Sequence, residues 1–131
     1  MEESLVARLL ASETISGLII DRIHWVSAPE GEPLPYLVLR IAAGNRQYNH
    51  DGPVDLQYPR IQFDSYGETY AEVKALSRAV LSEMEMPHEA EDVEFEDAIL
   101  VLDQDMPKES LEGGTEVFRV TMDFMVPFRS T

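Results

Sequence analysis

Three carboxylates, Asp64, Glu68 and Glu72, follow one another at intervals of four residues in the segment IQFDSYGETYAEVKALSRAV, residues 61–80. Carboxylates act as a general acid and base when they converge in one cleft with separated pKa values. Here Asp64 falls on the polar face of a predicted strand, Glu68 in a turn, and Glu72 in the first turn of a predicted helix. The helix dipole favours such acids by about 0.3–1 kcal/mol each. Thr69 and Glu72 also have the spacing of a capping box, so we interpret the segment as a strand-to-helix junction and not as an active site.

The remaining candidates for chemistry are sparse. His24, His50 and His88 lie in a predicted strand, a loop and an acidic connector, without the H-x-x-x-H or H-E-x-x-H spacing of metal sites. Asp51 precedes a glycine but lacks the ligand pattern of a calcium loop. The chain has no cysteine, which excludes disulfides, thiolate metal sites and cysteine nucleophiles. Nucleophile-elbow, P-loop and dinucleotide motifs are also absent from the sequence. We therefore expect no catalytic residue, no metal and no cofactor.

The charge of the chain limits its partners. Its 131 residues carry 25 acids and 10 bases, a formal net charge of −15. Proteins that grip nucleic acid neutralise phosphates with Lys and Arg, and here the bases are scattered. We expect neither DNA binding nor adsorption to an anionic membrane. Solubility explains such a charge, and so does a surface past which DNA must slide.

The N-terminal stretch MEESLVARLL opens with acids and lacks the pattern of a signal peptide. No apolar run approaches the roughly 18 residues of a membrane span. We therefore expect a soluble protein that is made in the cytoplasm, with residues 1–131 forming one domain.

Hydrophobic periodicity predicts the elements. An amphipathic helix covers residues 4–11, and a second helix runs from Thr69 to Met84. Strands are predicted at 22–26, 36–43, 58–65, 98–102 and 117–128, with a long loop at 44–57, a solvated acidic connector at 88–97 and a turn-rich connection at 103–114. The pattern indicates an α+β fold, with an antiparallel or mixed sheet of about four to five strands and two helices packed on one face.

The last predicted strand has the strongest alternation in the chain. One face carries Phe118, Val120, Met122, Phe124, Val126 and Phe128, and the other carries Arg119, Thr121 and Asp123. Strands average about 5–6 residues, so this one is long. Either all of it lies in the core, or part of it pairs with a neighbouring molecule.

The ordered motifs resemble a known family. The chain presents LVARLLAS, DRIHW, PLPYLVLRI, a polar loop with DGP, the segment RIQFDSYGETYAEVKALSRAV and a closing VFRVTMDFMVPFR. In this order they resemble the tail-completion, or tail-terminator, proteins of long-tailed bacteriophages and phage-derived gene transfer agents. The likeness covers nearly the whole chain and includes no catalytic signature.

The resemblance implies a structural role in the virion. Such a protein forms a ring, usually a hexamer, at the head-proximal end of the tail tube, is assembled in the bacterial cytoplasm, and joins the tube to the head connector or stopper protein. DNA passes through the ring without specific binding. We expect the variable 45–57 loop, with Arg46, Tyr48, Asn49, His50 and Asp51, to face either the lumen or the neighbouring subunit.

Three other interpretations of the sequence stay open. The first is a head-side connector or stopper protein. The second is a small acidic hydrolase that uses Asp21, His24 and one further acid, for which a bell-shaped pH profile is the signature. The third is a ligand-binding module, which requires a closed apolar pocket.

Overall fold

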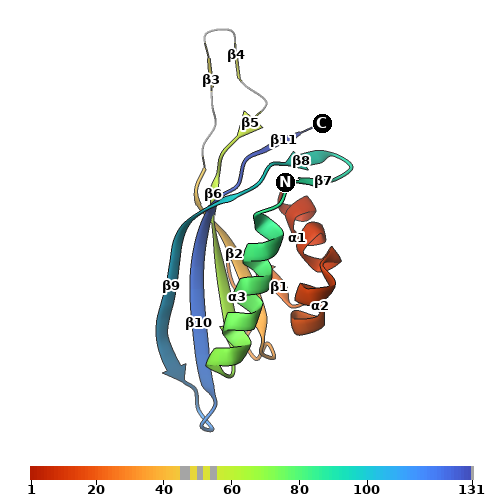
Figure 1. Ribbon diagram of the computed structural model, residues 1–131. Helices are drawn as coiled ribbons and strands as arrows, with labels where there is room; N and C mark the ends of the chain where they lie inside the picture. Colours follow the sequence, from red (N-terminus) through yellow and green to blue (C-terminus); the bar gives the residue numbers. More distant parts are fainter. Residues whose placement is uncertain (45–47, 50–51, 54–55, 131) are drawn as a thin grey trace.

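The computed structural model describes residues 1–44, 48–49, 52–53 and 56–130. Its main sheet has five strands in the order β1-β2-β6-β10-β9 (Figure 1). Their bounds are β1 (Ile23–Trp25), β2 (Tyr36–Ala43), β6 (Arg60–Gly67), β10 (Glu116–Met125) and β9 (Ile99–Ser110). β1 runs parallel to β2 and the other pairs are antiparallel, so the predicted α+β class with a mixed sheet is confirmed.

Three helices pack on one face of this sheet: α1 (Glu2–Ala11), α2 (Glu13–Ile19) and α3 (Tyr70–Met84) (Figure 1). The core between helices and sheet includes Phe63 and Phe124, whose rings meet edge to face at 5.2 Å between centroids. The sequence predicted two helices and missed α2. Ser12 caps α2 by accepting a hydrogen bond from the amide of Ile15 at 3.3 Å, and the helix buries Ile15 and Ile19.

The junction between β6 and α3 is close to the predicted capping box. The Thr69 hydroxyl accepts a hydrogen bond from the amide of Glu72 at 3.1 Å, as predicted. The Glu72 carboxylate, however, accepts from the amide of Glu68 at 2.9 Å, one residue before the expected donor. Gly67 allows this approach, because a Cβ there would lie 3.0 Å from the backbone nitrogen of Val73.

A second, four-stranded sheet has the order β5-β11-β8-β7. Its strands are β5 (Leu56–Gln57), β11 (Phe128–Ser130), β8 (Val93–Phe95) and β7 (His88–Glu89). The prediction of a solvated connector at 88–97 is therefore wrong. Val93 and Phe95 are buried in the core while Glu94 between them is exposed, which is the alternation of a strand.

β9 and β10 form a long hairpin. β9 is a twelve-residue strand, although only 98–102 was predicted as strand and 103–114 as a connection. The turn after it contains Gly113 and Gly114, both with positive φ. The predicted final strand stops at Met125, and β11 then pairs with β5 and β8 of the same chain. Its C-terminal part is therefore used within the chain, and among the described strands the main sheet has edges at β1 and at the much longer β9.

The two strands on either side of the predicted 44–57 loop, β2 and β6, pair antiparallel, with pairs such as Leu39 and Phe63 in register. Within the connection between them, β3 (Tyr48–Asn49) pairs with β4 (Gly52–Pro53). Among the described residues, no helix is long and apolar enough to cross a membrane.

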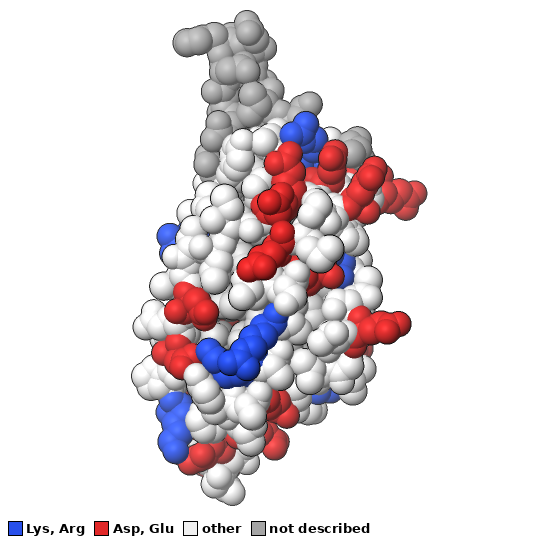
Figure 2. All heavy atoms as spheres, in the orientation of Figure 1, with Lys and Arg blue, Asp and Glu red and all other residues white. Residues whose placement is uncertain are grey.

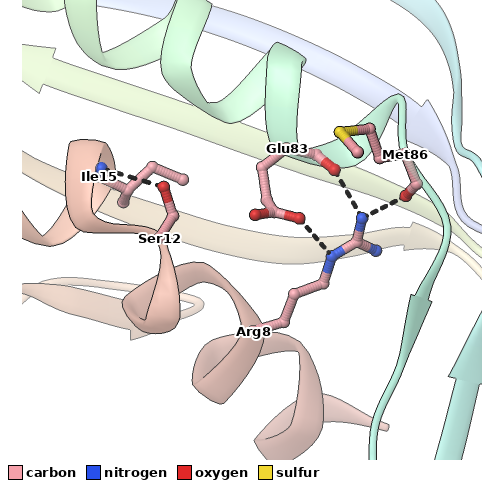
Figure 3. A network of polar contacts seen from close by, with 5 residues as sticks. All are labelled: Arg8, Ser12, Ile15, Glu83 and Met86. Carbon is pink, nitrogen blue, oxygen red and sulfur yellow. Dashed lines mark hydrogen bonds and ion pairs between the residues drawn. The ribbon is translucent and has the colours of Figure 1, made fainter.

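A buried arginine fastens α1 to the end of α3 (Figure 3). Arg8 is 1% exposed, and its Nε donates to the Glu83 carboxylate at 3.1 Å. Its Nη2 donates to the carbonyl oxygens of Glu83, at 2.6 Å, and of Met86. The guanidinium also lies 5.4 Å from the centroid of the Phe95 ring. Arg8 thereby adds a donor to carbonyl groups at and just beyond the C-terminal end of α3, where the Glu83 carbonyl also accepts from the amide of Met86 at 3.3 Å.

Candidate interaction surface on the open face of the sheet

The face of the main sheet away from the helices, here called the open face, carries mostly polar side chains. Strand register places them in three rows across β2, β6 and β10. The rows are Tyr36, Tyr66 and Arg119; Val38, Asp64 and Thr121; and Arg40, Gln62 and Asp123. Alternation along each strand therefore brings together residues that lie far apart in the sequence.

Asp64 is the centre of a hydrogen-bond network on this face. Its Oδ1 accepts from the Thr121 hydroxyl at 2.7 Å, and its Oδ2 accepts from Gln62 Nε2 at 2.9 Å and Arg119 Nη2 at 3.0 Å. Gln62 Oε1 in turn accepts from Arg40 Nη2 at 2.7 Å. Asp64 is 7% exposed although no helix covers it, because these longer side chains lie over it. A carboxylate held by three donors has a structural role, which agrees with our interpretation of the 64–72 segment.

Asp123 forms a second pair on the open face. Its Oδ2 accepts from Arg60 Nε at 2.8 Å, and the residue is 4% exposed. Two buried atoms nearby, Asp123 Oδ1 and Arg119 Nε, have no hydrogen-bond partner among the described residues. Such groups carry a desolvation cost that a further contact would offset.

Two stacked tyrosines close one end of the face. The rings of Tyr36 and Tyr66 are 4.7 Å apart at an interplanar angle of 21°, and the Arg119 guanidinium lies 5.7 Å from the Tyr66 centroid. Burial raises the pKa of Tyr36, and the nearby charges of Glu32 and Glu109 raise it further. Burial also raises the pKa of Tyr66 and outweighs the opposing charge of Arg119.

The open face ends at the free edge of β9. Among the described strands, β9 pairs with β10 alone, so its outer edge is uncovered. Ile99 and Val101 on this strand are 62% and 45% exposed. Ile99 is opposite Met125, and Met125 is opposite Arg60, so apolar side chains and a cation share one row. Free strand edges and exposed apolar side chains are features of binding surfaces.

The site residues predicted from the sequence all belong to the 45–57 loop. Arg46, His50 and Asp51 fall outside the described residues. The backbones of Tyr48 and Asn49 lie in β3, opposite Pro53 and Gly52. Their assignment to the lumen or to a subunit interface stays a prediction.

The two histidines that the structure describes are engaged in other contacts. His24 pairs with Glu32, and the His88 ring lies 6.4 Å from that of Phe95. Within the described part of the chain, no group of three or more His, Asp or Glu side chains is placed to hold a metal. Among the described residues, His24 contacts the acid Glu32 but no hydrogen bond or ion pair joins it to Asp21, so the hydrolase hypothesis gains no support.

Sequence reasoning missed the open face as a unit. Arg119, Thr121 and Asp123 were identified as one polar strand face, and Asp64 was placed on the polar face of another strand. The two polar faces form one surface because β6 pairs with β10, and hydrophobic periodicity does not predict which strands pair.

Comparisons with known proteins identify the chain's relatives. In a solved structure, "Virion of native gene transfer agent (GTA) particle", one chain is similar to this one with a TM-score of 0.55. The similarity covers 96% of this chain and 92% of that chain at 15% identity, which establishes a shared fold. No curated protein matches the sequence. The tail completion protein gp17 family matches residues 3–127, which confirms the resemblance inferred from the ordered motifs. Because this match spans nearly the whole sequence, the chain belongs to the tail completion protein gp17 family, whose members are structural proteins of phage tails.

Proposed function

We propose that this chain is a tail terminator. It forms a ring, most simply a hexamer, that caps the head-proximal end of a phage-like tail tube at the head–tail junction. There the ring ends growth of the tube and joins it to the head connector or stopper protein. All of residues 1–131 act as one ring-forming domain, assembled in the bacterial cytoplasm.

The family match over residues 3–127 is the observation that carries this proposal. A protein that completes a tail must bind the tube on one side and the head on another. The described surfaces agree with such a role, because the open face and the edge of β9 are free to meet other proteins while the helices cover the opposite face.

The charge of the chain supports a channel that DNA passes without binding. The formal net charge is −15, and Figure 2 shows acidic side chains spread over the helix side and gathered above the β7–β8 region. A ring of such subunits repels phosphate groups, which keeps moving DNA from adhering to its wall. We assign the 45–57 loop, with Tyr48, His50 and Asp51, to the lumen or to the contact with the next subunit.

The test is a particle assembled without this protein. We expect deletion of its gene to leave filled heads unjoined to tails and tail tubes of uncontrolled length, both visible by electron microscopy. Complementation with the intact gene restores joined particles. Joined particles with tubes of normal length in the deletion strain would exclude the terminator role.

The loop assignment has its own test. Reversing charge in the loop, as in Arg46→Glu with Asp51→Lys, leaves the net charge unchanged and is expected to reduce ring assembly or DNA delivery. Arg78→Glu with Glu30→Lys is a matched control at exposed positions outside the loop. Normal assembly and delivery by the loop variant would exclude both assignments.

A further inference from the structure

We propose that the open face beside β9 binds a second copy of this chain through that copy's acidic segment 89–97. The inference rests on the ring proposed above and specifies which two surfaces meet in it. Two arginines on the open face use only some of their hydrogen-bond donors.

Arg40 and Arg60 each retain unused hydrogen-bond donors. Arg40 is exposed and donates one bond, from Nη2 to Gln62. The Arg60 side chain is 42% exposed and donates from Nε to Asp123. A guanidinium has five N–H donors in a planar fork that fits a carboxylate. The remaining N–H groups of these two guanidinium groups are therefore suited to bind carboxylates from outside the chain.

The open face also differs in charge from the rest of the molecule. Its central rows and Arg60 contain three arginines and two aspartates, Asp64 and Asp123, so their sum is 3 − 2 = +1. The whole chain carries −15. At the other end, Glu109 lies opposite Val117 beside the tyrosine pair. The middle of the open face is thus a cationic region that attracts an acidic partner.

The residue types favour a protein partner over DNA. Tyr, Met and Arg are enriched at protein interfaces, while Lys and Glu are depleted. The open face carries Tyr36, Tyr66, Met106, Met125, Arg40, Arg60 and Arg119. Ile99, 62% exposed, lies in the same row as Met125 and Arg60. A phosphate backbone has no apolar surface to cover Ile99, whereas a protein segment does.

A second copy provides the required acids. Glu89, Glu94 and Asp97 are exposed and form no ion pair with any described residue. They lie in and after the β7–β8 hairpin, whose second strand leads through residues 96–98 into β9 (Figure 1). Contact between two different surfaces of identical chains is head-to-tail, and such contacts close into a ring when the rotation permits.

Charge reversal on each surface tests the contact. The acceptor variant is Arg40→Glu, chosen because Arg40 is exposed and no buried acid depends on it. The donor variant is Glu94→Arg with Asp97→Arg. Arg78→Glu and Glu30→Arg are the controls, since both residues are exposed and lie outside the two surfaces. Circular dichroism confirms that each variant is folded.

Association is measured by native mass spectrometry at raised concentration and, for chains bound to tubes, by cross-linking. We expect each variant to weaken self-association about tenfold or more, and the controls to leave it unchanged. A chain with both reversals has complementary charges again and regains the ring. Mixing the two single-surface variants also restores complementary charges at every contact between unlike chains, so alternating assemblies of the two variants should form although neither variant assembles alone.

Cross-linking gives an independent result. The chain has no cysteine, so Gln104→Cys with Glu94→Cys reacts with a bismaleimide at those two positions alone. We expect a ladder of linked subunits when wild-type contacts form on tail tubes. A ring that persists in both variants, or a ladder that fails to form in an assembled ring, would overturn the proposed contact while leaving the terminator role intact. Loss of that role would instead appear as normal particles in the deletion strain.

Discussion

Arg8 provides a quantitative test of how the helices are fastened to one another. The change is Arg8→Met, which keeps an unbranched side chain of similar length and removes the guanidinium. In the folded chain, Arg8 donates to the Glu83 carboxylate and to the carbonyl oxygens of Glu83 and Met86 (Figure 3). All three bonds are lost in the variant.

The expected loss follows from burial. Arg8 is 1% exposed, and burial lowers its pKa more strongly than the hydrogen bond and charge of Glu83 raise it. Part of the gain from its bonds therefore offsets the cost of desolvating the cation. Breaking a buried charged pair costs about 3–5 kcal/mol, and we expect about 3 kcal/mol here because the Glu83 side chain is 24% exposed and water can solvate it.

The free energy of unfolding is measured by urea titration. The single tryptophan, Trp25, is half-buried in β1 and reports unfolding by its fluorescence. Arg8→Met should lower the midpoint with little change in slope. Glu83→Gln keeps both carbonyl bonds and should lose only about 1 kcal/mol. A loss below about 1 kcal/mol for Arg8→Met would refute the reasoning, since water would then satisfy the end of α3 as well as the arginine does.

Three further measurements test local features. Thr69→Ala removes the cap of α3 and should reduce the free energy of unfolding by about 1 kcal/mol in urea, whereas Thr69→Ser should preserve it. Hydrogen bonds from Tyr70 and a nearby lysine lower the pKa of Asp105, so the stability it contributes is present above its unfolded pKa and is lost as pH falls through the folded value. Asp105→Asn should therefore flatten the acid side of the plot of melting temperature against pH, and an unchanged slope would contradict this. The raised pKa values of Tyr36 and Tyr66 predict that both ionise above the ordinary pKa of a tyrosine, with stability falling as pH rises above about 10. Ultraviolet titration should show the late component, and a double change to Phe should remove it.

The sequence predicted the central strands because their burial alternates. In β10, Val120, Met122 and Phe124 face the helices and the residues between them face the other way. The failures have physical reasons. α2 has only seven residues with Gly17 among them, so its periodicity is weak, and tertiary burial of Ile15 and Ile19 determines the helix.

β9 was only partly predicted because side chains on both faces of its second half are exposed. Its residues after Leu102 are mostly exposed, so hydrophobic periodicity is absent there, and pairing with β10 determines the strand. In the 88–97 segment, the many acidic residues made a short alternation of buried and exposed side chains hard to recognise. Val93 and Phe95 are buried beside exposed Glu94, a two-residue period that a count of acids does not detect.

The open face could not be predicted from the sequence, and the reason is different. Asp64 receives bonds from Arg119 and Thr121, which lie 55 and 57 residues further along the chain. Periodicity assigns each residue to a face of its own strand but does not state which strands are neighbours. The partners of Asp64 follow from the order of strands in the sheet, and that order depends on packing of the whole core.

The organisation of the open face reconciles stability with assembly. Under the function proposed above, a subunit must fold before it meets its partners, and an uncovered sheet face is a hazard for such a protein. Here the buried acids Asp64 and Asp123 are paired within the chain, so the face does not require a partner in order to fold. An outer layer remains available for later contacts. It consists of the unpaired N–H groups of Arg40 and Arg60 and the exposed side chain of Ile99. A change to the inner layer, or to Arg60 that pairs with buried Asp123, should therefore lower stability and assembly together, whereas a change to Arg40 or Ile99 should affect assembly alone.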